Sequence, residues 1–187
     1  LNKMRSDALF ADVPLAKWAR LINHGPCVVV TSGDAARANA APAQWNMPVN
    51  DDPPVAALAL DADNFTSALV AKTGEFVLNV PDAALLPALK ILGSRSGRDG
   101  DKIGPTGLTL APGRKVAVPH LAAALAFIEC KVRKTVDVDG VRLILGDVLY
   151  AGASPAHFKD NRWLPGVQTV HHLGGMVFAL TGERRSP

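Results

Sequence analysis

Two long β-type runs joined by a tight turn constrain the fold of this chain more than any other feature. Residues 122–138 and 141–150 are rich in apolar and β-branched side chains, and only Asp139-Gly140 separates them. An Asp-Gly dipeptide between two such runs favours the left-handed backbone that a two-residue hairpin turn requires. A chain organised around so long a hairpin is expected to form mainly antiparallel β-structure.

Shorter β-type runs and single helices surround this hairpin. The β-type runs are residues 27–31, 54–60, 75–80 and 167–180, and the predicted helices are residues 14–22, 65–73 and 82–91. Gly174-Gly175 interrupts the last β-type run, and residues 38–49 are too poor in large apolar groups for an ordinary core element. Because strands outnumber helices, and the helices fall singly between them, we predict a closed antiparallel β-barrel with a few peripheral α-helices.

The length and the apolar content indicate one folded domain over residues 1–187, with residues 1–13 and 182–187 as extended arms. The chain is 48% hydrophobic, which excludes disorder as its main state. No apolar run approaches the roughly 20 residues that a membrane-spanning helix needs. The first residues lack the apolar stretch of a secretory signal, so a cytoplasmic protein without membrane association is expected.

The charge balance argues against a nucleic-acid partner. The chain has twenty Lys and Arg residues and seventeen Asp and Glu residues, which gives a net charge of +3. Nucleic-acid binding would need basic residues clustered on one face, with aromatic side chains available for stacking. A mild positive balance fits a small anionic ligand better.

Familiar catalytic and metal-binding signatures are missing. Cys27 and Cys130 lie in β-type runs, without a C-x-x-C pair, and are expected to be buried, reduced thiols rather than a disulfide. No G-x-S-x-G elbow, phosphate-binding P-loop or H-E-x-x-H pair occurs. His171 and His172 are neighbours in a predicted strand, so their side chains should point to opposite faces and cannot easily ligate one metal. We therefore expect no catalytic constellation and no metal site.

Two polar segments are candidates for binding an anion. The glycine-rich stretch from residue 93 to 107 begins with two arginines, a lysine and two serines within ten positions. Such a loop either binds phosphate through its cations and backbone amides, or is a solvated loop with internal salt bridges to Asp99 and Asp101. Thr66, in the first turn of a predicted helix, either binds an anion or belongs to a plain helix cap.

A third segment, residues 39–48, suits a flat ligand. Its small residues let a ring approach the backbone closely, and Gln44 and Asn46 could form hydrogen bonds with a heteroaromatic edge. Trp45 either covers such a ring or fills the core, and the residue by itself favours core packing.

Eight short segments along the chain, which include parts of those just described, give the sequence a resemblance to a known family. The segments that carry it, in chain order, are residues 28–32 (VVVTS), 39–45 (NAAPAQW), 52–56 (DPPVA), 73–81 (TGEFVLNVP), 96–103 (SGRDGDKI), 107–109 (GLT), 128–130 (IEC) and 171–175 (HHLGG). In this order, they make the chain resemble the flavin reductase-like family of FMN-binding split-barrel proteins from about residue 18 to residue 180. One departure is that Met176-Val177-Phe178 stands where an aromatic residue, often tyrosine, is common.

The resemblance implies a Greek-key split barrel of six or slightly more strands, which works as a homodimer with FMN near the subunit interface. The implied cofactor contacts are Ala43, Gln44, Trp45 and Asn46 around the ring and ribityl chain, Asp61, Thr66 and Ser67 near the ribityl chain and phosphate, Ser94, Arg95, Ser96 and Lys102 toward the phosphate, and His172, with His171 as second choice, near the flavin.

The activity that the resemblance implies is NAD(P)H:flavin oxidoreduction. A flavin accepts hydride at N5, so the protein needs no nucleophile or acid-base pair of its own, which agrees with the missing motifs. Reduced flavin would pass to oxygen, ferric iron or a partner monooxygenase. Two alternatives stay open: an FMN-carrying electron-transfer protein reduced by a protein donor, and a binding module for another group such as haem.

Overall fold

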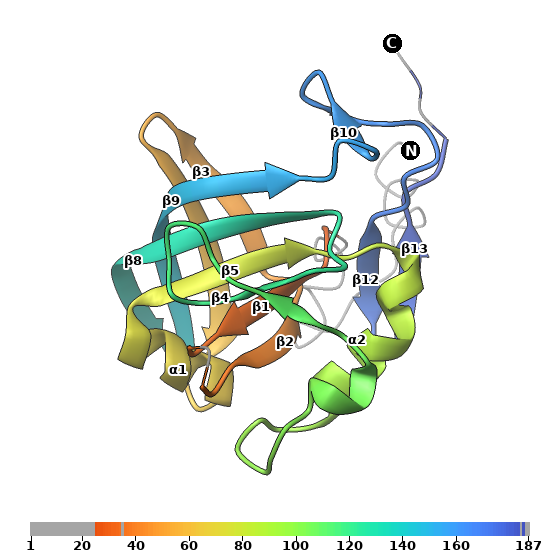
Figure 1. The fold of residues 1–187 in the computed structure, drawn as a ribbon. Helices are drawn as coiled ribbons and strands as arrows, with labels where there is room; N and C mark the ends of the chain where they lie inside the picture. The colour runs from red at the N-terminus through yellow and green to blue at the C-terminus, as the bar shows by residue number, and fades with distance from the viewer. Residues whose placement is uncertain (1–24, 35, 184, 186–187) are drawn as a thin grey trace, which may run out of the picture.

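A seven-stranded antiparallel sheet dominates the computed structural model, which describes residues 25–34, 36–183 and 185 (Figure 1). Its strands are β1 (Val28–Ser32), β2 (Asn39–Ala43), β3 (Asn46–Asp51), β4 (Pro54–Asp61), β5 (Glu75–Val80), β8 (Ala126–Val138) and β9 (Val141–Ala153). The predicted helix at residues 14–22 and the arm at residues 1–13 lie outside the described residues. The mainly antiparallel β fold is confirmed.

The order of the strands closes the sheet on itself. They follow one another as β2-β1-β5-β8-β9-β4-β3, so the two outer strands, β2 and β3, are consecutive in the chain. Only Gln44 and Trp45 separate them, and the backbone amide of Ala59 in β4 donates a hydrogen bond of 2.9 Å to the Trp45 carbonyl. This short link joins the two edges of the sheet and makes the barrel.

The long hairpin predicted from Asp139-Gly140 is present as β8 and β9. Val138 pairs with Val141 across the turn, and both turn residues have positive φ angles, 45° for Asp139 and 89° for Gly140. These are the left-handed conformations that Asp and Gly tolerate best. The first strand begins at Ala126 rather than at residue 122, because residues 120–121 form the short strand β7.

β1 is buried on both faces, which explains its unbroken apolar run. Val28 and Val30 point into the barrel core, where Leu58, Phe76 and Ile144 also pack. On the other face, Val29 packs, together with the preceding Cys27, in a second core that includes residues of α2. As predicted, Cys27 and Cys130 are buried and free.

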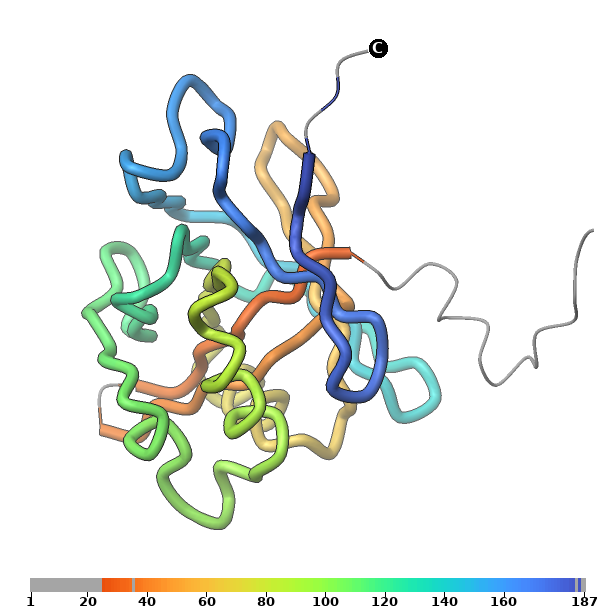
Figure 2. The backbone as a smooth tube through the Cα atoms, turned by 90° about the vertical axis from the view of Figure 1, so that its right-hand side faces the viewer, coloured from red at the N-terminus to blue at the C-terminus, as the bar shows by residue number. Residues whose placement is uncertain are grey.

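Two nine-residue helices lie outside the sheet. α1 (Phe65–Thr73) lies at one end of the barrel, and α2 (Leu86–Ser94) lies beside the hairpin of β12 (Val170–Gly174) and β13 (Val177–Leu180) in both views (Figures 1 and 2). Short 3-10 turns precede and follow α2 at Ala83–Leu85 and Gly104–Thr106. Within the described residues, no helix is long and apolar enough to cross a membrane.

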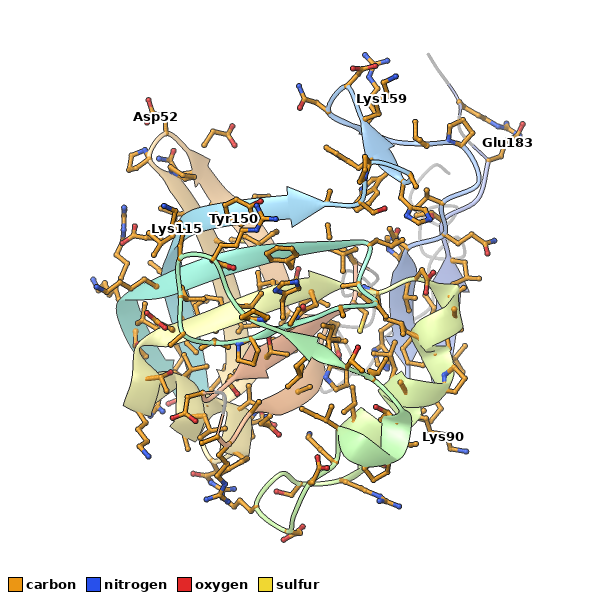
Figure 3. The ribbon with its side chains drawn as sticks, in the orientation of Figure 1. Asp52, Lys90, Lys115, Tyr150, Lys159 and Glu183 are labelled. Atoms are coloured by element: carbon orange, nitrogen blue, oxygen red, sulfur yellow. The ribbon has the colours of Figure 1, made fainter. Side chains whose placement is uncertain are left out.

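The remaining strands are short pairs. β6 (Leu110–Ala111) pairs with β7 (His120–Leu121), and β10 (Phe158–Lys159) pairs with β11 (Arg162–Trp163). Figure 3 shows Lys159 at the outer end of the second pair, away from the barrel.

Two expectations about the site-bearing segments were wrong. Residues 38–49, expected to lack an ordinary core element, form β2 and β3, and Ala40 of β2 is fully buried. β2 carries small side chains, so its sequence lacks the large apolar residues that usually indicate a core strand. These small side chains allow α2 to pack closely on β2, since a Cβ added to Gly93 would lie 3.2 Å from Pro42. The polar loop is also shorter than predicted, because α2 continues through Gly93 to Ser94.

A buried asparagine ties the barrel to its covering segment. The Asn79 amide nitrogen donates to the Val29 carbonyl at 2.9 Å and to the Thr31 hydroxyl at 3.1 Å, and its oxygen accepts from the Leu121 amide at 2.7 Å. The side chain is fully buried on β5. It therefore satisfies polar groups of β1 and β7 that no water can reach.

We expect Asn79→Ala to lower the free energy of unfolding by about 2 kcal/mol or more, because it leaves buried donors and acceptors unpaired. Urea denaturation followed by circular dichroism measures this. Asn50→Ala is the control, since it removes an exposed hydrogen bond of 2.9 Å to the Pro53 carbonyl and should change stability by less than about 0.5 kcal/mol. Equal losses in the two variants would contradict this role for Asn79.

Candidate functional site

A cavity of about 480 Å³ lies where three elements meet against β2. Its walls are the first turn of α1, the end of α2 with the loop that follows, and the β12–β13 hairpin. Figure 2 shows the hairpin running beside α2 on this side of the barrel. This volume is typical of a site for a small ligand.

The start of α1 presents a fixed hydroxyl to the cavity. Asn64 caps the helix by accepting a hydrogen bond of 2.6 Å from the Ser67 amide. Thr66, in the first turn, is 3% exposed, and its hydroxyl accepts a hydrogen bond of 2.9 Å from the Asn39 amide nitrogen. Free backbone amides and the positive end of the helix dipole make such a first turn favourable for an anion.

The loop after α2 is anchored on this same turn. Gly97 packs so closely on the Asn39 side-chain oxygen and on Phe65 that an added Cβ would lie 2.7 Å from the ring. The Arg98 guanidinium donates to the Asp63 carbonyl at 2.7 Å and lies 5.8 Å from the centre of the Phe65 ring. The loop cations are thereby held beside the α1 first turn.

The cavity is electropositive. Arg95, Arg98 and Lys102 line it, and no Asp or Glu is among the lining residues that the structure describes. Of the described ion pairs, none involves these three cations, which also argues against the alternative of a solvated loop closed by salt bridges. Cations without carboxylate partners next to a helix N-terminus favour a bound anion, and phosphate fits this donor set best.

Lys102 does not extend freely into the cavity as a phosphate ligand would. Its side chain is 6% exposed, and its ammonium donates to the carbonyl of Leu92 at 2.8 Å and to that of Arg95 at 3.2 Å. Burial lowers the pKa of this ammonium below its usual range. The lysine therefore contacts the end of α2 and borders the anion site.

The opposite wall is formed by the β12–β13 hairpin. The rings of His172 and Phe178 meet edge to face, with centres 5.3 Å apart. The Nε2 atom of His172 lies 2.9 Å from the Gly175 carbonyl, which can only accept, so Nε2 carries the proton. His171 borders another cavity, at the mouth of the barrel, which confirms that the two histidines point to opposite faces.

Among the residues that the structure describes, no activated cysteine borders the cavity. Cys27 is its one cysteine, and burial raises the pKa of this thiol to about 11, so it stays protonated at neutral pH. In the part of the chain that the structure describes, no three His, Cys, Asp or Glu side chains come together as a metal site would require. The cavity can therefore bind and orient a ligand but offers little chemistry of its own.

Most of the predicted contact residues meet in this cavity. They are Gln44, Thr66, Ser94, Arg95, Ser96, Lys102 and His172. Three more, Ala43, Trp45 and Asp61, line a smaller cavity of about 220 Å³, whose lining also includes Pro42, Gln44 and Asn64 of the main one. The two cavities therefore adjoin along the link between β2 and β3.

Two predicted residues lie elsewhere. The Asn46 amide nitrogen donates to the carbonyls of Pro26 and Ala43, and the residue borders the barrel mouth. The Ser67 hydroxyl accepts a hydrogen bond of 3.2 Å from Arg142 and lines neither cavity. A cofactor contact for either residue stays a prediction that this geometry does not favour.

The core-packing interpretation of Trp45 was wrong. Its side chain is 46% exposed, at the link that closes the barrel. It lines the smaller cavity and does not enter the core.

Several lining residues are absent from the predicted contacts. Phe65, Gly97 and Arg98 all border the main cavity, as does Phe178, which the sequence marked only as standing near a position where an aromatic is common. Arg98 and Gly97 belong to the polar loop, whose composition already indicated an anion site. Phe65 gave no signal beyond its place after a helix cap, and its contact with Gly97 depends on how the loop folds back onto α1.

Comparisons with known proteins agree with this geometry. Residues 20–180 match the family model of the flavin reductase-like domain. The uncharacterized protein YddH of Escherichia coli K12 is 32% identical over 182 residues, which cover 94% of this chain and 96% of YddH.

Solved structures show the same fold. An FMN-binding protein from Thermus thermophilus superposes with a TM-score of 0.84 at 24% identity, over 95% of this chain and 98% of that one. The FMN-binding domain of a flavin reductase-like enzyme from Shewanella baltica has a TM-score of 0.79 at 27% identity, over 95% and 96% of the two chains.

We expect Gly97→Ala to cost about 1–3 kcal/mol of stability, because the added methyl group collides with Phe65 and forces the loop away from α1. Thermal or urea unfolding measures the loss. Gly182→Ala is a matched control, since an added Cβ there meets nothing within 4 Å. A Gly97→Ala variant as stable as this control would show that the loop does not depend on the close contact.

Proposed function

The chain belongs to the flavin reductase-like family, and on that premise we propose that it is an NAD(P)H-dependent FMN oxidoreductase. The electropositive cavity between α1, α2 and the β12–β13 hairpin carries this proposal, because it joins an anion site to a wall suited to a flat ring. Reduced flavin would then pass to oxygen, ferric iron or a partner monooxygenase.

The residues present fit FMN. Thr66, the amides of the first turn of α1, Arg95 and Arg98 would hold the phosphate, since no carboxylate among the described lining residues opposes it. Gln44, on the link between β2 and β3, would contact the ring or ribityl chain between the two adjoining cavities. The apolar side chain of Phe178 would pack near the ring.

The flavin, when bound, supplies a ring that takes hydride from a reduced nicotinamide. The protein's part is to bind and orient. The loop cations and the α1 first turn would anchor the phosphate, and the hairpin would limit the position of the ring. The cavity opens to solvent, so a nicotinamide could enter beside the bound ring. Because the flavin would supply the chemistry and the protein would bind and orient it, the site needs no nucleophile.

With either NADH or NADPH, we expect the FMN-loaded protein to oxidise the nucleotide at least about tenfold faster than free FMN does, because both reactants are held in place. Anaerobic titration, followed by bleaching of the flavin absorbance, measures reduction directly. If neither nucleotide bleaches the flavin, the reductase proposal is wrong.

The same titration separates the other functions. A slow, unsaturable reduction by both nucleotides, with FMN tightly bound, would favour the electron carrier that takes electrons from a protein donor. A visible spectrum of the purified protein that shows haem or no chromophore, together with failure to bind added FMN, would favour the non-flavin binding module.

We also propose that the protein is a homodimer. Trp45, just before β3, and Met47 and Val49 within it have side chains 46–59% exposed, which is unusual for a surface that stays in water. The β12–β13 hairpin adds Leu173 and Met176, which are also exposed. Trp45 and Met176 line the two adjoining cavities, so a second copy that covered these side chains would also cover the site.

We expect the double substitution Met47→Asp and Val49→Asp to convert the dimer to a monomer, because two charges would be buried at the interface. Size-exclusion chromatography with light scattering measures the mass. Val138→Asp, at a 53% exposed position at the end of the β8–β9 hairpin, is the control and should stay dimeric. A monomeric wild-type protein would contradict the dimer.

A further inference from the structure

The end of α2, where carbonyl groups lack partners within the helix, borders the anion site. Residues 92–94 of the last turn, and Arg95 after them, line the main cavity. The last carbonyls of a helix have no partner within it, and together they carry about half a negative charge. Left alone, this end would repel a phosphate bound in the cavity.

Lys102 covers this end of the helix. Its ammonium binds the carbonyls of Leu92 and Arg95, at 2.8 and 3.2 Å, from a position ten residues beyond the first of them. The segment enclosed by these contacts contains Arg95 and Arg98, two cations of the cavity. One lysine therefore both opposes the carbonyl charge and ties the two ends of the loop together.

The environment of Lys102 is unfavourable for a charge held only as a helix cap. The side chain is 6% exposed, although an exposed lysine could bind the end of a helix without losing its hydration. An ammonium has three N–H donors, and the two carbonyls account for two of them. Lys102 also borders the cavity itself, so its charge acts on whatever anion binds there.

We propose that Lys102 is a positioning residue for the FMN phosphate. It acts through the carbonyls of Leu92 and Arg95, holding the loop in its binding conformation and cancelling the negative charge of the α2 end. This inference rests on the proposed function, because it assumes that the anion is the flavin phosphate. It replaces the direct phosphate contact that the resemblance implied for this residue.

The test compares FMN with riboflavin, which has the same ring and ribityl chain but no phosphate. Quenching of flavin fluorescence measures both affinities in the wild-type protein, Lys102→Met, Lys102→Arg and Lys90→Met. Lys90→Met is the matched control, because Lys90 is an exposed lysine on the outer side of α2 and lines neither cavity (Figure 3).

We expect Lys102→Met to weaken FMN binding by about tenfold or more, as for loss of hydrogen bonds to a charged group, and to change riboflavin binding by less than about twofold. Lys102→Arg keeps the charge and should recover part of the FMN affinity. Lys90→Met should match the wild type for both ligands. An unchanged FMN affinity in Lys102→Met would overturn the proposal, as would an equal loss for both ligands.

Alkaline pH gives a second readout that a purely structural lysine would not produce. Burial lowers the pKa of Lys102, so its charge should be lost below the pH at which an ordinary lysine titrates. As the pH rises from about 7 to 10, the ratio of FMN to riboflavin affinity should fall in the wild type but not in Lys102→Met or Lys102→Arg. Ionisation of the flavin ring affects both ligands and cancels in the ratio.

Other titratable groups near Lys102 do not account for this pH dependence of the affinity ratio. The charged and titratable residues that border the main cavity, or a further cavity of about 500 Å³ that Lys102 also lines, are Cys27, Arg37, Arg95, Arg98, Asp101 and His172. Lys102→Met and Lys102→Arg retain all of these groups, so any contribution of theirs to the pH dependence would appear in the two variants as well. Burial raises the pKa of Cys27 to about 11, beyond the range. A ratio that stayed constant with pH in the wild type would overturn the proposal.

A measurement without flavin distinguishes loss of phosphate binding from misfolding of the variant. Inorganic phosphate should raise the melting temperature of the wild type and of Lys90→Met, but have little effect on Lys102→Met, whose circular dichroism should be native. Equal stabilisation of all three would overturn the positioning role. A wild-type protein that binds neither FMN nor riboflavin would refute the proposed function itself, which is a different result.

Discussion

The burial of β1 on both faces is the constraint on which the rest of the structure depends. One face completes the barrel core, and the other packs in the core that α2 shares. A strand in this position needs apolar side chains throughout, and the neighbouring strand β2 needs small ones where α2 approaches, as Ala40 shows. The placement of α2 against the barrel in turn decides where its last carbonyls and the loop after it lie.

The site is built from the ends of these elements rather than from their middles. The first turn of α1, the last turn of α2 and the turn of the β12–β13 hairpin converge on one cavity. The positive end of one helix faces an anion favourably, and the negative end of the other is covered by the buried ammonium of Lys102. The electrostatics of the cavity therefore depend on contacts among backbone groups as much as on charged side chains.

A cavity of this kind contributes mainly by binding and orienting a ligand. Its cysteine is protonated at neutral pH, and none of the ion pairs in the described part of the chain involves its cations. Exposed apolar side chains at Trp45 and in β3 lie beside the smaller cavity, so the proposed dimer would cover the surface at which the site opens.

The sequence by itself determined the antiparallel barrel, its longest hairpin, the two buried cysteines and the family. These depend on local patterns: β-branched runs, the Asp139-Gly140 turn and short motifs in a fixed order. Only the tertiary structure decided the strand character of residues 38–49, the exposure of Trp45, the hydrogen bond from Arg142 to Ser67 and the carbonyl partners of Lys102. Each of these depends on which segments, distant in the sequence, pack against one another, and spacing along the chain does not specify that.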